Sequence, residues 1–343
     1  MKRACSALGL LVLLWTALAF GQTVGAGYHI IDSIQVGGDG GWDYLIVDSD
    51  AQRAYLSHAT CVTVVDLAKH AVAGEIPNTP GVHGIALVPA RGKGYTSNGR
   101  DSSVTVFDPA TLTTLARIKI QARNPDAILY DPSSDRLFTF NGGSASATAI
   151  DTKSDTVLGT ISLPGKPEFA VTDLKGTIYV NIEDKSLVVG FDARTLKVLS
   201  TWSIAPGDEP SGLAIDREHG RLLSVCGNKL MVVLDMASGK VIATVPTGEG
   251  TDGAAFDPGP HIAFSSNGEG TLTVVREDAP EKYSSAGNIP TRRGARTVTV
   301  DPKTHRVYTV SARFGPAPAP TPERPRPRPP VEPGSFTLYV IGR

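Results

Sequence analysis

One short pattern, an apolar strand that ends in aspartate, recurs along this 343-residue chain at nearly constant spacing. The steps between successive copies are 42, 43, 41 and 43 residues, and these copies end at Asp66, Asp108, Asp151, Asp192 and Asp235. A further step of 41 residues leads to Arg276, where the aspartate is replaced. A period near 42 residues is typical of propeller blades built from four short strands. The repeat therefore predicts a β-propeller.

Each repeat contains four short apolar runs, which the second repeat shows most clearly. These runs are rich in Val, Ile, Thr and aromatic residues and are bounded by Gly, Pro, Asn or Asp, and they cover residues 85–88, 94–97, 104–107 and 114–120. Such runs indicate strands separated by turns. The chain's 36 glycines and 25 prolines fit the many tight turns that this arrangement needs. No segment carries a sustained helical period, so we expect an all-β fold with four-stranded blades.

Counting the repeats predicts seven blades in one domain, residues 22–343. The blades begin near residues 44, 85, 127, 169, 212, 253 and 297. The seventh lacks its fourth strand and carries a Pro-rich insertion at residues 315–334, whereas a spare strand lies near the N-terminus at residues 30–36. We therefore expect the N-terminal strand to complete the C-terminal blade. This closure would hide the sheet edges that invite aggregation.

Residues 1–21 have the features of a cleaved signal peptide. Lys2 and Arg3 form a basic start, an apolar run covers residues 8–20, and Ala17-Leu18-Ala19 offers a small-x-small cleavage pattern. The apolar run is too short to span a bilayer comfortably. We therefore expect a periplasmic or secreted protein with no transmembrane anchor after cleavage.

The blade count also bears on the two cysteines of the mature chain. Cys61 falls in the first blade and Cys226 in the fifth, so the two are not neighbours in a ring of seven. A disulfide requires Cα atoms within about 7 Å of each other. We predict two separate thiols.

Several runs of the chain resemble a known repeat type. The segments PDAILYDPSSDRLFTFN, SSVTVFDPATLTTLARI and DGAAFDPGPHIAFSSN resemble YVTN-type repeats, and residues 27–343 are similar to YncE-like seven-bladed β-propellers. The resemblance implies the propeller fold and an exported location. It implies no single activity, because propellers include lactonases, lyases, scaffolds and ligand-binding proteins.

Polar residues recur where the innermost strands begin, at the expected mouth of the central channel. Counting five residues back from the aspartate that ends each inner strand selects one position per blade, namely Asp43, Gly84, Asp126, Glu168, Ser211, Asp252 and Arg296. His83 and Trp42 each stand one residue earlier in their own blades. The candidate ligand-binding residues are Asp43, His83, Asp126, Glu168, Asp252 and Arg296.

Three interpretations of this ring remain open. The acids could cap the turns of their own blades and be structural. Asp43, Asp126, Glu168 and Asp252 could instead bind Ca²⁺, which takes six to eight oxygen ligands; no other cofactor is predicted. The third interpretation is an organic ligand or catalysis, with Asp126 or Glu168 as general base, His83 as acid and Arg296 holding an oxygen. We favour a binding or scaffold module over the alternative of a lactonase-like hydrolase or lyase, and whether the protein is an enzyme stays open.

The net charge of the chain and its Pro-rich insertion indicate which kinds of binding partner to expect. Without Lys2 and Arg3 the chain keeps 31 basic and 34 acidic residues, which argues against nucleic-acid binding. In the insertion Arg324, Arg326 and Arg328 alternate with prolines, which favours an extended segment. It could act as a lid or as a docking arm for an anionic partner, or it could be a solvated insertion without function. We expect a monomer whose partner is a protein or a small molecule.

Overall fold

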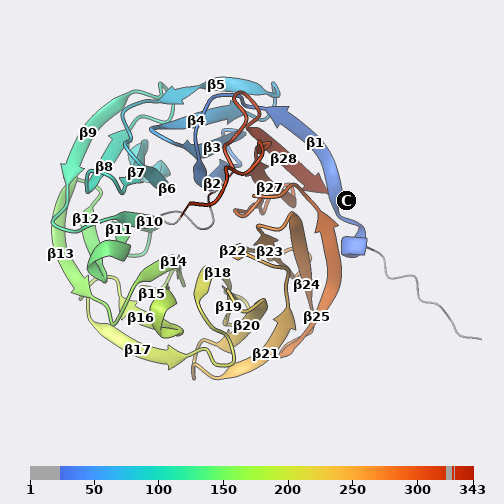
Figure 1. The fold of residues 1–343 in the computed structure, drawn as a ribbon. Coiled ribbons are helices and arrows are strands. Elements are labelled where there is room, and N and C mark those ends of the chain that lie inside the picture. The colour runs from blue at the N-terminus through green and yellow to red at the C-terminus, as the bar shows by residue number, and fades with distance from the viewer. Residues whose placement is uncertain (1–23, 322–326, 328) are drawn as a thin grey trace, which may run out of the picture.

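The strands of the protein form seven four-stranded antiparallel sheets arranged in a ring (Figure 1). The computed structural model describes residues 24–321, 327 and 329–343. This architecture confirms the predicted all-β, seven-bladed propeller. The expected signal peptide at residues 1–21 lies outside the described residues. Within the described part of the chain, no helix has the length and apolar character needed to cross a membrane.

Each of the first six blades uses four consecutive strands, from the channel outward. Blades 1 and 2 consist of β2 (Trp42–Asp48), β3 (Arg53–His58), β4 (Cys61–Asp66) and β5 (Ala71–Ile76), then β6 (Val82–Val88), β7 (Lys93–Asn98), β8 (Ser103–Phe107) and β9 (Thr114–Lys119). Blades 3 and 4 consist of β10 (Pro125–Asp131), β11 (Arg136–Asn141), β12 (Ser146–Asp151) and β13 (Thr156–Ser162), then β14 (Pro167–Thr172), β15 (Thr177–Ile182), β16 (Leu187–Asp192) and β17 (Val198–Ser203). Blades 5 and 6 consist of β18 (Pro210–Asp216), β19 (Arg221–Cys226), β20 (Leu230–Asp235) and β21 (Val241–Pro246), then β22 (Thr251–Asp257), β23 (Ile262–Asn267), β24 (Thr271–Ala279) and β25 (Lys282–Pro290).

The seventh blade is built from both ends of the chain, as the repeat count predicted. Its inner strands are β26 (Thr299–Asp301) and β27 (Arg306–Ser311), and its outer strands are β28 (Thr337–Gly342) and β1 (His29–Gln35). β1 pairs antiparallel with β28, so that Ser33 lies opposite Tyr339. The described 3-10 helices are single turns, η1 (Val24–Gly27), η2 (Pro89–Arg91), η3 (Gly142–Ser144) and η4 (Glu183–Lys185).

The repeated aspartate closes the turn after the third strand of a blade. The Oδ1 atom of Asp108 accepts the N–H groups of Ala110 at 2.7 Å and Thr111 at 3.2 Å. The same two bonds, to the residues two and three positions on, occur at Asp66, Asp151 and Asp192. Such Asx turns explain why aspartate marks the repeat. In blade 6, where Arg276 replaces it, β24 continues to Ala279 and forms a longer hairpin with β25.

The apolar core is divided among the junctions between neighbouring blades. The described residues form seven buried clusters, and each one joins two adjacent blades. Between blades 3 and 4, for example, the rings of Phe140 and Phe191 lie 6.4 Å apart. Cys61 and Cys226 are free thiols in separate blades, which agrees with the prediction. The inner strands of the seven blades line a cavity at the centre of the ring, which we call the channel.

Candidate functional site

An irregular start to the inner strand positions the polar side chains at the channel mouth. In blade 1, Trp42 pairs with His58, but the next pair is Leu45 with Leu56, so two residues on β2 oppose one on β3. The same β-bulge opens the inner strand of all the first six blades. Bulges re-aim a side chain away from the regular strand direction. The first bulged residues are Asp43, His83, Asp126, Glu168, Ser211 and Asp252.

The register of blade 2 differs from the sequence prediction, which placed Gly84 in the ring. Val82 pairs with Asn98 and Ile85 with Thr96, so His83 occupies the position of Asp43. The count failed because β6 ends at Val88 and lacks the terminal aspartate from which the position was counted. Gly84 instead lets blades 2 and 3 approach closely, since a Cβ there would lie 2.8 Å from Cγ2 of Ile128.

Serine hydroxyls on the second strand hold three of these bulges in place. The backbone N–H of Asp43 donates to Oγ of Ser57 at 2.9 Å, and that of Gly84 donates to Oγ of Ser97 at 2.9 Å. In blade 6 the N–H of Gly253 donates to Oγ of Ser266 at 3.1 Å. In these three blades the bulged backbone of the inner strand is therefore fixed to the second strand by a hydrogen bond.

One half of the ring is a continuous hydrogen-bonded chain. Oγ of Ser211 donates to Oδ1 of Asp252 at 2.8 Å, and the guanidinium of Arg296 donates to the other carboxylate oxygen of Asp252. Arg296 also reaches the carbonyl of Trp42 at 3.2 Å and Oδ1 of Asp43 at 3.4 Å. Burial raises the pKa of Asp252, although the nearby Arg296 charge opposes this rise. Blades 5, 6, 7 and 1 are thus linked across the mouth.

The chain of contacts continues to His83 and ends at Asp126. Nδ1 of His83 lies 2.6 Å from Oδ2 of Asp43 and 3.7 Å from Oδ1 of Asp126. Burial alone would lower the pKa of His83, but these two carboxylates outweigh it and raise the pKa. The donor atoms of the three residues lie within 4.8 Å of one another, a spacing compatible with a bound cation.

Asp126 and Glu168, on neighbouring blades, form the remaining part of the ring. The side chain of Asp126 is 14% exposed, and its carboxylate accepts no hydrogen bond from any described residue. Burial raises its pKa to about 6. Burial, followed by the charge of Asp126, raises the pKa of Glu168 to about 8. At neutral pH the pair therefore carries a proton, held mainly by Glu168.

Three acids of the ring already have a Lys or Arg partner, which limits the metal interpretation, and one of them is Asp43 with Arg296 at 3.4 Å. Nζ of Lys166 lies 2.6 Å from Oε1 of Glu168, and Arg296 pairs with Asp252. The cluster of donor atoms found at the mouth comprises Asp43, His83 and Asp126, without Glu168 or Asp252. Lys166 was missed in the sequence because only one position per blade was considered, although it lies two residues before Glu168.

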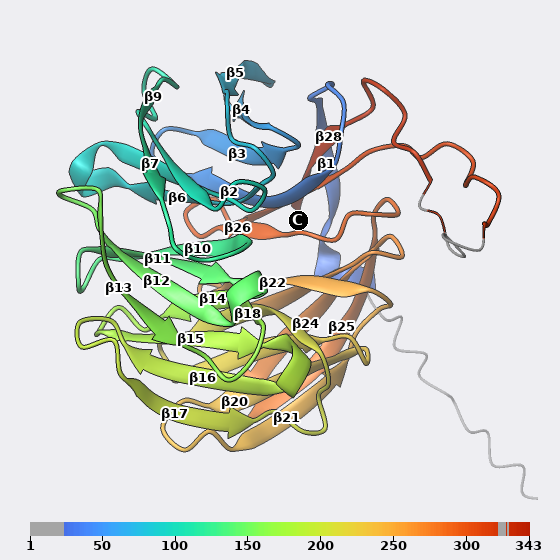
Figure 2. The same ribbon diagram turned by 60° about the vertical axis from the view of Figure 1, so that its left-hand side comes forward.

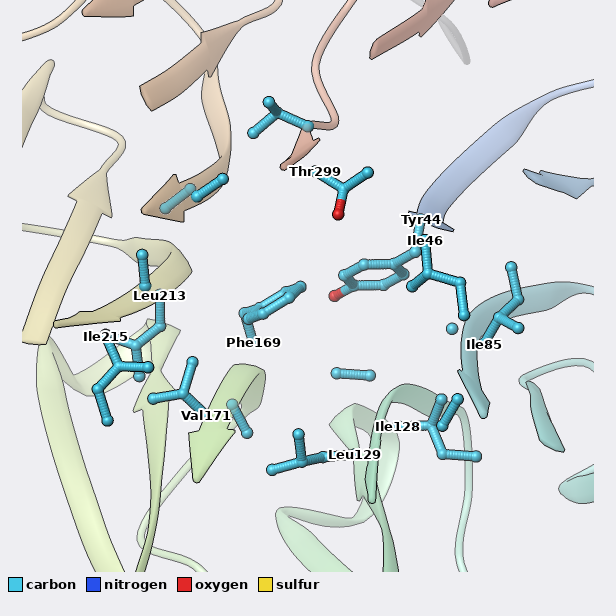
Figure 3. A pocket seen from close by; sticks show the side chains of 18 of the residues that line it. Tyr44, Ile46, Ile85, Ile128, Leu129, Phe169, Val171, Leu213, Ile215 and Thr299 are labelled. Carbon is cyan, nitrogen blue, oxygen red and sulfur yellow. The ribbon is translucent and has the colours of Figure 1, made fainter. Parts of the chain in front are cut away.

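Below the polar ring most side chains that line the channel are apolar, Arg217 and Thr299 being exceptions, and two aromatic rings form its floor. Tyr44 and Phe169, each next to a ring residue, project toward each other with ring centroids 5.4 Å apart (Figure 3). Burial, then the charges of Asp126, Asp43, Glu168 and Asp252, raise the pKa of Tyr44. The cavity below has a volume of about 410 Å³ and is lined mainly by aliphatic side chains such as Ile46, Ile128 and Ile215.

The base of the Pro-rich insertion borders the same mouth. Phe314 and Val331 form an isolated β-bridge, and the rings of Phe314 and Trp42 lie 5.9 Å apart. Together with Arg296 these residues line a second cavity of about 390 Å³. Figure 2 shows the insertion projecting from the disc of the propeller. Arg324, Arg326 and Arg328, the expected docking arm, lie outside the described residues.

Comparison with known proteins identifies the fold. No protein-family model matches the chain, and the search of curated proteins finds no match. Among solved structures, the chain is similar to one described as Kuenenia stuttgartiensis Hydrazine Synthase, with 18% identity and a TM-score of 0.69 over 79% of this chain and 92% of that one. It is also similar to a chain of a Mitotic Checkpoint Complex, with 12% identity and a TM-score of 0.74 over 100% of this chain and 99% of that one. At these identities the likeness shows the β-propeller fold alone.

Proposed function

We propose that the protein is an exported, YncE-like β-propeller that binds a small cationic ligand, such as an amine, at the channel mouth. Its role would be that of a binding or scaffold module. The pattern of residues 1–21 supports export, and the YVTN-type repeats support the family. The observation that carries the ligand class is the carboxylate of Asp126, which faces the mouth without a hydrogen-bond donor.

A buried carboxylate without donors is unfavourable, because it loses its hydration and gains nothing in return. Asp126 has only His83 at 3.7 Å, and Glu168 beside it avoids the cost by holding a proton. Glu168 already has the ammonium of Lys166 beside it, so an external ammonium group placed beside Asp126 would supply the charge and the N–H donors that Asp126 lacks. Binding would therefore release the proton of Glu168 and tighten as pH rises through about 8.

The floor of the mouth suits the same class of ligand. The rings of Tyr44 and Phe169 lie below the acids, and the face of an aromatic ring attracts a cation within about 6 Å. The apolar channel beneath would accommodate the carbon skeleton of the ligand. A strongly anionic ligand would instead meet Asp43, Asp126 and the carboxyl of Glu168.

Matched pairs of probes test this proposal directly. Putrescine is compared with 1,4-butanediol and glucosamine with glucose by calorimetry, so that each pair differs in its amino groups. We expect at least one amine to bind more tightly than its neutral analogue, and Asp126→Asn to weaken that binding about tenfold, or about 1.4 kcal/mol. Asp50→Asn is the control, because Asp50 is 86% exposed and lies at the opposite end of β2. Equal binding of amines and neutral analogues would contradict the proposal, as would full affinity in Asp126→Asn.

A hydrolase or lyase with lactonase-like chemistry is the second candidate. The pair formed by Asp126 and Glu168 favours it, because a carboxylate and a protonated carboxyl with pKa values of about 6 and about 8 can act as base and acid near neutral pH. His83 lies 3.7 Å from Asp126, and Arg296 lies at the same mouth in contact with Asp43 and Asp252. A panel of lactones and esters is assayed with Asp126→Asn and Glu168→Gln. Turnover that disappears in both variants supports catalysis, and turnover that survives both excludes these two residues.

A further inference from the structure

A second cluster of histidine and carboxylate side chains lies where blades 5 and 6 meet, on the face opposite the mouth. Asp216 is the last residue of β18, and His219 lies in the turn that follows. His261 precedes β23 of blade 6, and Glu277 lies on β24. None of these residues belongs to the channel-mouth ring.

The donor atoms of the four side chains converge on one point. Nδ1 of His219 lies 2.9 Å from Oδ2 of Asp216 and 3.1 Å from Oε1 of Glu277. Nδ1 of His261 lies 3.5 Å from Oε2 of Glu277. All four donor atoms fall within 4.8 Å of one another. Two ligands on neighbouring corners of a zinc tetrahedron lie about 3.3 Å apart when each bond is about 2.0 Å long.

Glu277 departs from the pattern of the other blades. Its backbone N–H donates to the carbonyl of His261 at 3.1 Å. The residues that make the corresponding bond in blades 1, 4 and 5 are apolar, namely Leu67, Ala193 and Met236. In blade 6 the position holds a glutamate whose side chain is only 3% exposed. A carboxylate this deeply buried requires a compensating cation or proton.

One atom of the cluster lacks a partner. Nδ1 of His261 is fully buried and makes no hydrogen bond, although it faces Glu277. By contrast, Glu277 is oriented from outside the cluster, because the hydroxyl of Tyr283 donates to its Oε1 at 3.1 Å. Carboxylates that bind metals are commonly held by such an outer hydrogen bond.

We propose that Asp216, His219, His261 and Glu277 form a structural zinc site that joins blades 5 and 6. Two imidazole nitrogens and two carboxylates suit Zn²⁺ and together supply its four ligands. The two negative charges balance the charge of the ion. Because two ligands come from each blade, the bound ion would act as a cross-link at this junction. This site is independent of the function proposed for the mouth.

A neighbouring pair provides the matched control. Nδ1 of His305 lies 3.0 Å from Oδ1 of Asp257 at the junction of blades 6 and 7. It resembles the pair of His219 and Asp216, but no second histidine and no buried glutamate complete it within the described residues. His305→Gln therefore removes an equivalent surface histidine without touching the four proposed ligands.

The test measures zinc and cobalt binding to the full chain without an affinity tag. Wild type, His219→Gln, His261→Gln and His305→Gln are first stripped with chelator and then titrated by calorimetry and in competition with a chromophoric chelator. We expect His219→Gln and His261→Gln each to bind one zinc ion fewer than wild type, or to bind that ion with an affinity lower by roughly 10–100-fold. His305→Gln should bind that ion as wild type does. Co²⁺ should show the intense visible bands of a tetrahedral ion in wild type and in His305→Gln only.

Thermal unfolding separates the loss of zinc from misfolding. Without metal, His261→Gln should unfold close to wild type, because its side chain is partly exposed and its Nδ1 makes no hydrogen bond. His219→Gln removes contacts to Asp216 and Glu277, so its effect is read from the change on adding zinc. With zinc, wild type should gain melting temperature and the cluster variants should not. Wild type that binds no zinc at this junction, or a bound zinc ion that survives both His219→Gln and His261→Gln, would overturn the proposal. In that case the cluster is neutralised by a proton on a histidine.

Discussion

The two ends of the single strand β10 carry aspartates in opposite chemical states. Asp131, at the turn end, is fully buried and accepts hydrogen bonds from Ser133 at 2.8 Å, Ser134 at 2.6 Å and Thr172 at 2.6 Å. Burial alone would raise the pKa of Asp131, but these bonds outweigh it and lower the pKa. Asp126, at the mouth end, accepts no hydrogen bond from the described residues, and burial raises its pKa to about 6.

The comparison distinguishes carboxylates that are hydrogen-bonded within the protein from carboxylates that can bind an external ligand. Burial acts on both residues, so the difference lies in the donors that the protein supplies. At the turn end serine and threonine hydroxyls complete the hydrogen bonding of Asp131, and the residue holds two blades together. At the mouth end the donors are missing, so an external group can supply them. A carboxylate's hydrogen bonds are therefore a better guide to function here than its burial.

The largest effect that we expect is a difference in stability between variants at the two ends of β10. We expect Asp131→Ala to lower the free energy of unfolding by about 2–3 kcal/mol, because the buried hydroxyl of Thr172 and the half-buried hydroxyls of Ser133 and Ser134 lose their acceptor. Asp126→Ala should change it by less than about 0.5 kcal/mol or increase it, because no hydrogen bond is lost. Urea unfolding of both variants measures the difference. Equal losses at the two positions would show that Asp126 has a structural partner after all.

The second prediction concerns the pH dependence of stability. Glu168 has a pKa raised to about 8 in the folded protein, so between its ordinary value of about 4.5 and about 8 the folded state holds a proton that the unfolded state has lost. The free energy of unfolding should therefore fall as pH rises through this window, by at most about 1.4 kcal/mol for each pH unit. Glu168→Gln should flatten the profile, whereas Glu249→Gln, at an exposed glutamate, should leave it unchanged. A profile unaffected by Glu168→Gln would contradict the raised pKa.

A third, smaller effect on stability is expected at the turn end of β10, where Asp131 accepts its hydrogen bonds. Thr172→Val removes one of the hydroxyls that bond Asp131, at an expected cost of about 1 kcal/mol. Because the lowered pKa of Asp131 stabilises the fold above its unfolded pKa, this contribution is lost as pH falls. The variant, whose Asp131 has a less depressed pKa, should therefore lose less stability than wild type as pH falls below the unfolded pKa of aspartate. Thr160→Val, at an exposed threonine on β13, is the control, and identical acid limbs would argue against the role of Thr172.

The smallest effect is expected at the floor of the mouth. The hydroxyl of Tyr44 forms no hydrogen bond with any described residue, so Tyr44→Phe should change the free energy of unfolding by less than about 0.5 kcal/mol. The acids above it raise the pKa of this phenol. Spectrophotometric titration should accordingly lose one late-titrating tyrosine in the variant. If the variant instead lost a tyrosine with an ordinary pKa, the acids would not raise the pKa of Tyr44.

The repeat was sufficient to predict the architecture, because strand alternation and turn residues are local signals. The spacing of Asp66, Asp108 and their equivalents marks one turn in each blade, and the surplus strand at residues 30–36 indicated the closure that β1 and β28 make. In blade 2 the count selected Gly84, one residue after His83, because β6 ends at Val88 and lacks the aspartate from which the position was counted.

The partners of the site residues were harder to predict, because they come from other blades. Arg296 contacts Asp43 across 253 positions of the chain, and no spacing rule encodes such a contact. The cluster of His219, His261 and Glu277 was also missed. Its one signal was the replacement of the repeated aspartate by Arg276, which coincides with the lengthened hairpin that carries Glu277.

The division of the apolar core into seven separate clusters has a consequence for how this chain can vary. Each cluster belongs to one junction, so a change in a single blade is felt by two neighbours and not by the whole molecule. Blade 6 illustrates this tolerance, because its long outer hairpin coexists with the same pairing and β-bulge of the inner strands as in blade 5. New features can therefore accumulate at the rim and on the faces as independent modules, while the central ring keeps its geometry.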